Sequence, residues 1–561
     1  MAGVRTDDMM PARIHRGLLG RALLLIAALA GPAMAAPREP PIAAAEQRFA
    51  DWLDAGYATA SLRAGPMTRL DGLDLAAWER ARDRATRRLA DALARVPADD
   101  RGAEDARALA RMRQVLAEAR PAPAASNPDE TAASCEGAAD PELGRAALSA
   151  ALYACFEHFG NHVRFEERTI SRTTALELFQ EIDDGTRRQA LFDALRPLWA
   201  HIHAEGRRPS PYQRLIRLAA AEAAAQGASP IDRAAHTVGE TPAQVEAQLV
   251  AVLEAWRAAN PGPMMEPWDY WFDMTSGVRP LNDLIPPQRI PVLCQDYYRD
   301  LGVDLAALGV IEDLEVRPGK APLAYTDYVR IGRRTPDGWR PALVRVSANV
   351  EQGGLFVLNE IVHEDGHAVH MMAVRTRPAF YDLGDDLFLE AFADVTSWSV
   401  AEPVWQRRYL GRSIDAPVAL RALFANVVLD VAWGLFEQRM LRDPQAEPNR
   451  VWTDITARYL RIRPHPELAW WALRVQLVDV PGYMINYGLG AMVTAELRDR
   501  LRAAIGPFDA GNPRWFSYAS DHLLRYGAAI DTPELLGRFL GRPVSISPLL
   551  AQIERVGREA H

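Results

Sequence analysis

Apolar residues recur every three or four positions through most of the chain, which is the pattern of amphipathic helices. The spacing is clear between residues 73 and 120, and again at 188–205, 212–227 and 241–260. Thr241 with Gln244 three residues later has the sequence of a capping box, which predicts that the last of these helices starts there. The pattern as a whole predicts a mainly α protein.

The pattern changes between Leu314 and Val350, where apolar and polar residues alternate. Two such stretches, YTDYVRIGRR and RPALVRVSANV, flank the turn sequence TPDGW. Alternation predicts strands, and Pro-Asp-Gly predicts the turn that joins them. We therefore expect a small β-hairpin or sheet beside the helix that follows. The second strand, which runs into Ser347 to Asn349, is also a candidate for pairing with an extended peptide.

The start of the chain has a different pattern. Arginines at positions 13, 16 and 21 precede the apolar run 22–30, which is followed by Ala-Met-Ala at 33–35. This is the pattern of a secretory signal peptide, so we assign residues 1–35 to a signal and expect an exported protein, periplasmic or secreted. No later stretch offers about twenty uninterrupted apolar residues, so we expect no membrane anchor after signal removal.

Composition narrows the possible partners. The 561 residues are 49% hydrophobic and 24% charged, which suits two helical lobes or one large domain with a deep groove. The net charge of -9 comes from interspersed charges of both signs, so nucleic acid is not an expected partner. The three cysteines, Cys135, Cys155 and Cys294, permit at most one disulfide; a Cys135–Cys155 bridge and three free thiols are both open.

The stretch LNEIVHEDGHAVH, residues 358–370, carries the strongest chemical signal. His363 and His367 are four residues apart, so on a helix both imidazoles point from one face and can bind one ion. Glu364 beside them completes HExxH, in which two histidines bind zinc and the glutamate takes a proton from water. The motif also occurs by chance in ordinary helices, so further ligands are needed to support it.

A catalytic zinc site needs a third protein ligand and an open fourth position. Glu390, 23 residues after His367, stands in the apolar sequence LFLEAFADV, where an uncompensated acid is costly to bury. We predict Glu390 as the third ligand and Asp394, one turn later, as the acceptor that orients a ligand imidazole. Asp385 and Asp386 compete for the ligand role but fall in a loop-like sequence. One Zn2+ per chain is the expected cofactor.

Two further residues of the motif helix have structural interpretations. His370 follows His367 by three residues, but the sequence after it lacks the glycine and third histidine of a metzincin, so we interpret it as structural. Gly366 costs about 1 kcal/mol in helix propensity relative to alanine, which suggests that a neighbouring segment approaches closely there.

HEDGHAVH resembles the HExGHxxH signature of the thimet oligopeptidase family, and LEAFADV resembles the second zinc helix of the angiotensin-converting enzyme family. Weaker similarities to the former are EPWDYWF, RPGKAPLAYTDY and PGYMINYGLGAM, all within residues 261–500. The resemblance implies a two-lobed helical ellipsoid with zinc at the floor of a deep central channel. It assigns residues 261–561 to the zinc-peptidase catalytic region and leaves 36–260 as an N-terminal helical region.

The same resemblance places Tyr483 and Tyr487 at the family's catalytic tyrosines, where a phenol donates a hydrogen bond to the oxyanion. Two positions depart from the family: Gly490 replaces a tyrosine, and Val478 replaces a histidine. Tyr487 alone, or another residue such as His465, is then expected to serve the oxyanion. Packing residues are the alternative interpretation of both tyrosines.

The sequence therefore predicts an exported zinc metallopeptidase that cuts short peptides, as an oligopeptidase or peptidyl-dipeptidase, and acts as a monomer. Three alternatives stay open: a catalytically silent relative that binds peptides, a zinc hydrolase of non-peptide substrates, and a helical scaffold with a chance HExxH.

Overall fold

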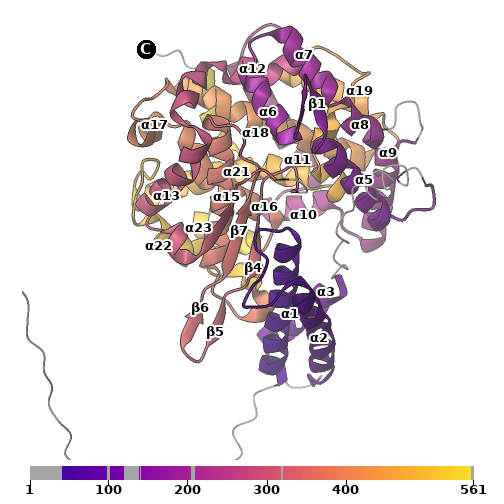
Figure 1. The fold of residues 1–561 in the computed structure, drawn as a ribbon, viewed down its shortest axis with the longest axis vertical. Helices are drawn as coiled ribbons and strands as arrows, with labels where there is room; N and C mark the ends of the chain where they lie inside the picture. The colour runs from indigo at the N-terminus through magenta and orange to yellow at the C-terminus, as the bar shows by residue number, and fades with distance from the viewer. Residues whose placement is uncertain are drawn as a thin grey trace, which may run out of the picture. The chain divides into compact units, whose positions relative to one another are not determined.

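The computed structural model describes residues 41–97, 102–118, 138, 140–203, 209–317 and 320–557. Helices dominate it, so the mainly α prediction is confirmed (Figure 1). The predicted signal peptide, Cys135 and the loop around residues 120–134 lie outside the described residues. Cys155 is disulfide-bonded, and Cys294 is a buried free thiol.

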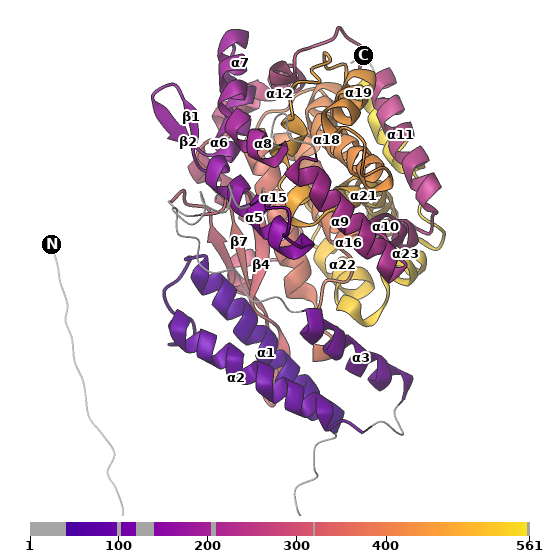
Figure 2. The ribbon, with the colours of Figure 1, turned by 90° about the vertical axis from the view of Figure 1, so that its right-hand side faces the viewer.

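The helices before residue 260 follow the predicted spacing, and the capping box of Thr241 and Gln244 is formed at the start of α11. They are α1 (Pro41–Arg63), α2 (Leu75–Ala94), α3 (Ala103–Glu118), α5 (Arg145–Gly160), α6 (Arg172–Glu181), α7 (Gly185–Ala194), α8 (Arg196–His203), α9 (Pro211–Gln226), α10 (Pro230–Val238) and α11 (Pro242–Ala259). Figure 2 shows α1 and α2 side by side with α3 next to them.

The helices after residue 260 surround the predicted metal site. They are α12 (Tyr270–Thr275), α13 (Ile290–Asp300), α14 (Leu305–Leu308), α15 (Leu355–Ala373), α16 (Asp386–Ser397), α17 (Pro403–Leu410), α18 (Ala416–Arg442), α19 (Pro448–Leu460), α20 (Gln476–Asp479), α21 (Met484–Ile505), α22 (Trp515–Ala519), α23 (Thr532–Leu540) and α24 (Ser547–Glu554).

One hydrophobic core joins the helices from α5 to α11 with those after residue 260, and smaller clusters hold the buried apolar residues of α1, α2 and α3. Its buried residues run from Ala138 to Val556, and the chain from Pro41 onward forms one compact unit. The helices on either side of residue 260 therefore pack on common apolar surface, and the boundary at 260 stays a prediction. Among the described residues, α18 is long and apolar enough to cross a membrane by length and composition, and 67% of its most apolar window is buried within the protein.

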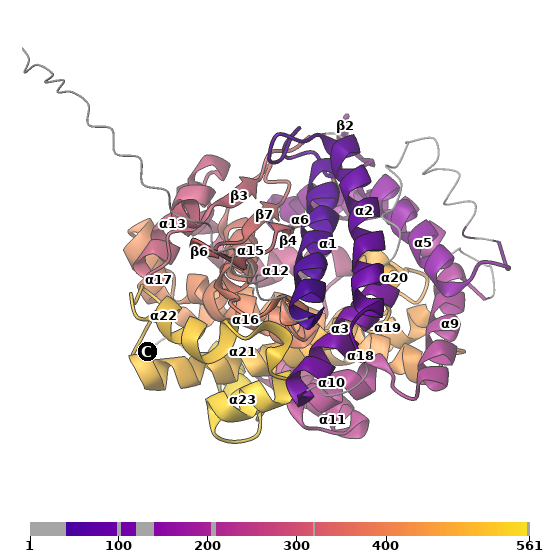
Figure 3. The same cartoon turned by 90° about the horizontal axis from the view of Figure 1, so that it is seen from below.

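A three-stranded sheet lies beside α15, in the strand order β3-β7-β4. The strands are β1 (Val163–Phe165), β2 (Arg168–Ile170), β3 (Val310–Asp313), β4 (Tyr325–Arg330), β5 (Arg333–Thr335), β6 (Gly338–Arg340) and β7 (Leu343–Ser347). The predicted antiparallel pair is β4 with β7, and β5 and β6 form the hairpin at the Pro-Asp-Gly turn. Helix α1 packs against β4 (Figure 3).

The expectation that a peptide pairs with the second predicted strand fails for Leu343–Ser347 and stays a prediction for Ala348 and Asn349, which follow the strand and line a cleft. That strand is β7, which lies in the middle of the sheet, parallel to β3 and antiparallel to β4. Its backbone groups are already paired on both sides, so they offer no free edge to a substrate. Strand β3 was not predicted, and it occupies the edge that the prediction left open.

Candidate metal centre and substrate cleft

Helices α15 and α16 carry the predicted ligands and cross at close range. His363 and His367 lie on α15, and Glu390 lies on α16. Gly366 is at the crossing, where a Cβ atom would come within 2.9 Å of the Cα and the carbonyl oxygen of Ala393. A glycine is therefore needed for this approach, as its position in the motif suggested.

The three side chains converge as a metal site requires. The Nε2 atoms of His363 and His367 lie 3.4 and 3.6 Å from Oε2 of Glu390. Ligands about 2.0–2.2 Å from a tetrahedral zinc ion lie about 3.3–3.6 Å from one another. Among the described residues this is the one group of histidine, cysteine and acidic side chains with metal-binding geometry. The donor set and its spacing therefore fit one zinc ion.

Asp394 lies where it was predicted, one turn beyond Glu390. Its Oδ1 is 2.8 Å from Nδ1 of His363 and also accepts a hydrogen bond from Ser397. This contact leaves Nε2 of His363 directed at Glu390, which is the arrangement found around metal-binding imidazoles. Nδ1 of His367 is buried and has no such partner in the described part of the chain.

The close contact between acidic and imidazole groups shifts the pKa values of His363 and Glu390. Burial alone would lower the pKa of His363, but Asp394 and Glu390 raise it well above its ordinary value. Burial would raise the pKa of Glu390, but the two histidines hold it below its ordinary value. A zinc ion at these ligands would compete with a proton for the imidazole of His363.

Glu364 is buried beside the ligands, with 5% of its surface exposed. Thr326 on β4 donates a hydrogen bond of 2.7 Å to its Oε2, and burial raises the pKa of Glu364 against the lowering effect of His367 and His363. Thr326 therefore fixes one carboxylate oxygen and leaves the other for water. No local pattern in the sequence marks Thr326, because it lies 38 residues from Glu364 along the chain and reaches it only through the sheet.

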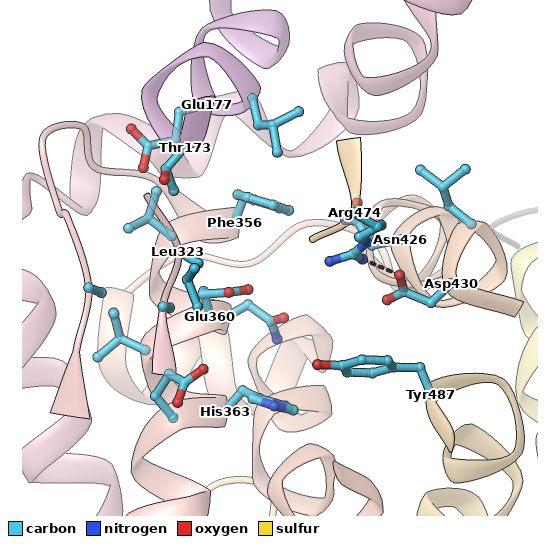
Figure 4. Close-up of a pocket in the computed structure, with 18 of the residues that line it drawn as sticks. Thr173, Glu177, Leu323, Phe356, Glu360, His363, Asn426, Asp430, Arg474 and Tyr487 are labelled. Carbon is cyan, nitrogen blue, oxygen red and sulfur yellow. Dashed lines mark hydrogen bonds and ion pairs between the residues drawn. The ribbon is translucent and has the colours of Figure 1, made fainter. Parts of the chain in front are cut away.

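The two tyrosines occupy different positions. The hydroxyl of Tyr483 donates a hydrogen bond of 2.7 Å to Oε1 of Glu390, so it contacts a predicted ligand rather than open space. Tyr487 lines the cleft, and its hydroxyl points toward His363 (Figure 4). Tyr487 is thus the one placed to meet a substrate, and Tyr483 is placed to hold Glu390.

The remaining candidates lie away from the reacting region. His370 is buried between the rings of Phe388 and Phe392, each 5.5 Å away, which agrees with its structural interpretation. His465 contacts Glu266 and Glu467 and is not among the residues that line the cleft. Val478 is buried. Gly490 packs against α16: a Cβ atom added to it would lie 3.6 Å from the carbonyl oxygen of Leu387, in ordinary contact.

A cleft lies over this centre between α15, α18, α6 and the strand edge (Figure 4). The space between its walls, including the part open to solvent, is about 1500 Å³. Arg474 lines it opposite α15 and forms an ion pair with Asp430 of α18. Its guanidinium carbon is 6.0 Å from the ring of Tyr487. The motifs did not single out Arg474.

Comparison with known proteins gives the fold. No protein-family model and no curated protein matches the chain. The structure is similar to the M32 carboxypeptidase of Deinococcus radiodurans R1, with 16% identity, a TM-score of 0.51, and coverage of 90% of this chain and 96% of that one. It is also similar to a carboxypeptidase of Pyrococcus furiosus and to metallocarboxypeptidase 1 of Trypanosoma cruzi. Each is 14% identical, over 92% of this chain and 99% of the other, with TM-scores of 0.53 and 0.51.

These three structures are carboxypeptidases, and at such low identity they establish a shared fold. The resemblance to the thimet oligopeptidase and angiotensin-converting enzyme families stays a prediction drawn from short motifs.

Proposed function

We propose that the chain is a zinc-dependent metallopeptidase that removes the C-terminal residue of short peptides. The observation that carries the proposal is the convergence of His363, His367 and Glu390, with His363 and the adjacent Glu364 lining a cleft. The carboxypeptidases of the same fold support this choice over the oligopeptidase or peptidyl-dipeptidase that the motifs suggested.

His363, His367 and Glu390 would hold the zinc ion, one per chain. When bound, zinc supplies Lewis-acid chemistry, activating a water molecule and polarising the scissile carbonyl. Glu364 accepts a proton from the attacking water and passes it to the leaving nitrogen, while Thr326 keeps its carboxylate oriented. Tyr487 donates a hydrogen bond to the oxyanion as it forms.

Arg474 is the residue that we expect to bind the C-terminal carboxylate of the substrate and so direct cleavage to the C-terminus. Only one of its five N–H donors is used in the bond to Asp430, so the others can bind a substrate carboxylate. Because Arg474 lies close to the ring of Tyr487, a carboxylate bound there would be near the scissile bond. This favours release of one residue over release of a longer piece.

Metal analysis of the purified protein, together with mass spectrometry of a mixed peptide library with and without chelator, tests the proposal. We expect one zinc per chain and chelator-sensitive loss of single C-terminal residues. Glu364→Gln should keep zinc and lose turnover, whereas His367→Ala should lose both. Glu534→Gln, which removes the same charge from an exposed position on α23, is the matched control.

Other results of this experiment would support a different function. Release of dipeptides would indicate a peptidyl-dipeptidase, and internal cleavage an oligopeptidase. Zinc binding without cleavage of any peptide would indicate a silent peptide-binding relative or a hydrolase of other substrates. Absence of bound zinc would refute the proposal outright.

We also propose that the protein is exported, because of the signal pattern in residues 1–35. Cell fractionation and N-terminal sequencing of the mature chain test this. A cytoplasmic protein with an intact N-terminus would contradict it. The monomeric state stays a prediction.

A further inference from the structure

The cleft contains more acidic side chains than its own contacts account for. Two arginines, Arg172 and Arg474, line it together with five acids: Glu177, Glu360, Glu364, Asp394 and Asp430. Glu364 is bonded to Thr326, Asp394 to His363, and Asp430 to Arg474. Glu177 and Glu360 remain.

Glu360 lies on α15, three residues before His363, and is exposed. Its carboxylate points into the cavity (Figure 4). Among the described residues it forms no hydrogen bond or ion pair. An acid in the wall of a cleft with no partner of its own is available to a ligand, and it would attract a positive charge.

Glu177 lies on α6, above Glu360 in Figure 4, and only 5% of it is exposed. One carboxylate oxygen accepts a hydrogen bond from the backbone of Gln352, and Oε2 is buried without a partner. A buried oxygen without a hydrogen-bond partner is unfavourable, and a donor group of a ligand would satisfy it. Burial raises the pKa of Glu177 to about 8, so this second acid adds a hydrogen-bonding group to the wall farther from the zinc ligands, and a cation bound beside it would favour its ionised form.

Neither arginine forms a hydrogen bond or ion pair with Glu360 or Glu177 in the described part of the chain, although the charge of Glu360 acts on the pKa of both guanidiniums. Arg474 is paired with Asp430 on the opposite wall. Arg172 directs its terminal nitrogens to the carbonyl oxygens of Leu473 and Pro322. The two walls of the cleft therefore differ, with the guanidinium of Arg474 beside α18 and the unpaired acids Glu360 and Glu177 on α15 and α6.

We propose that Glu360, supported by Glu177, binds a positively charged group of the peptide, so that the preferred substrates carry an ammonium or guanidinium near the scissile bond. The proposal rests on the peptidase function proposed above. Three residues along a helix span about 4.5 Å, and one residue of extended chain spans about 3.3–3.6 Å. The cation would then lie one or two residues from the cut. It comes either from a lysine or arginine side chain or from the free N-terminus of a very short peptide.

The test compares Glu360→Gln with the parent protein, both loaded with zinc, on three peptides that share one C-terminal residue. One is N-acetylated and neutral, one is N-acetylated with a lysine before the cut, and one is a lysine-free dipeptide with a free amino group. A hydrogen bond between charged groups contributes enough for about a tenfold to hundredfold change. We expect kcat/KM of Glu360→Gln to fall by at least about tenfold on one or both cationic peptides and by less than about twofold on the neutral one.

The pattern of loss identifies the source of the charge. Loss on the lysine peptide alone assigns the site to a side chain, and loss on the dipeptide alone assigns it to the N-terminus. Glu360→Lys should reverse the preference toward a peptide with an acidic residue. Glu534→Gln controls for the change in net charge and should leave all three rates unchanged.

Equal loss on all three peptides would indicate a structural role for Glu360 and overturn the proposal, as would no loss on any. A second readout keeps the proposal separate from the proposed function. Calorimetric binding of the lysine peptide and the neutral peptide to the Glu364→Gln variant, with and without Glu360→Gln, requires no turnover. A preference for the cation that Glu360→Gln abolishes supports the site even if cleavage fails, and equal affinities refute it.

Discussion

Gly366→Ala tests how closely the metal site depends on the contact between α15 and α16. The added methyl carbon would lie 2.9 Å from the Cα and the carbonyl oxygen of Ala393, about 0.5 Å inside the 3.4 Å at which ordinary contact begins. Both neighbours are backbone atoms, so no side chain can rotate away. Ala393 lies between Glu390 and Asp394 on α16, and any retreat of that helix moves both acids away from the histidines.

Two opposing effects determine how Gly366→Ala changes the free energy of unfolding. Alanine improves helix propensity by about 1 kcal/mol, whereas overpacking of this kind costs about 1–3 kcal/mol. Gly537 in α23 has nothing within 4 Å of an added Cβ, so Gly537→Ala shows the propensity gain alone. We expect Gly366→Ala to be about 1–3 kcal/mol less stable than Gly537→Ala. A shift of about 0.5 Å is also at the tolerance of a preorganised site, so zinc affinity should fall by about tenfold or more.

Urea unfolding of both variants with chelator present measures the stability difference without any contribution from the metal. Competition with a chromophoric chelator measures zinc affinity. If Gly366→Ala matches Gly537→Ala in stability and the parent in zinc affinity, the close crossing does not set the site, and the reasoning is wrong.

Three further predictions concern residues around the site. Asp394→Ala should lower zinc affinity by about tenfold to a hundredfold, because His363 loses the acceptor on Nδ1, and unchanged affinity in the same chelator competition would contradict this role. Tyr487→Phe should lower kcat by about a hundredfold to a thousandfold with zinc retained, because the oxyanion loses a donor. Tyr483→Phe should chiefly weaken zinc binding, because Glu390 loses a hydrogen bond. If kinetic and zinc-binding measurements show the opposite pattern, Tyr483 serves the oxyanion and Tyr487 supports the metal site. Glu437 is fully buried under the turn that leads into α21, and burial raises its pKa to about 8. Between about pH 4.5 and pH 8 its carboxyl ionises in the unfolded chain but not in the folded protein, so its contribution to the free energy of unfolding should decline as pH rises. Glu437→Gln should flatten the pH dependence of the unfolding free energy in that range, and an unchanged dependence would refute the assignment.

The sequence predicted what depends on local spacing. His363, His367 and Glu364 follow from helical periodicity, and Glu390 was recognisable because an acid in an apolar helix needs a partner. The structure brings His363 and His367 within 3.4–3.6 Å of Glu390, which agrees with the predicted ligand set, and their role as ligands stays a proposal.

What the sequence did not predict depends on contacts between distant segments. Thr326 and Arg474 reach the site across the sheet and from the loop before α20, and nothing in their neighbours marks them. The central position of β7 in the sheet was missed for the same reason, because pairing with β3 is decided by the fold and not by alternation within the strand. Tyr483 was assigned to the oxyanion by resemblance, and only the structure shows its hydroxyl on Glu390.

The most direct test of the account is a crystal structure of the zinc-loaded protein with anomalous data collected on both sides of the zinc absorption edge. The account predicts a single strong anomalous peak in the cleft, with Nε2 of His363, Nε2 of His367 and an oxygen of Glu390 about 2.0–2.2 Å from it. A peak elsewhere, or a structure in which Glu390 turns away from the two histidines at full zinc occupancy, would contradict it.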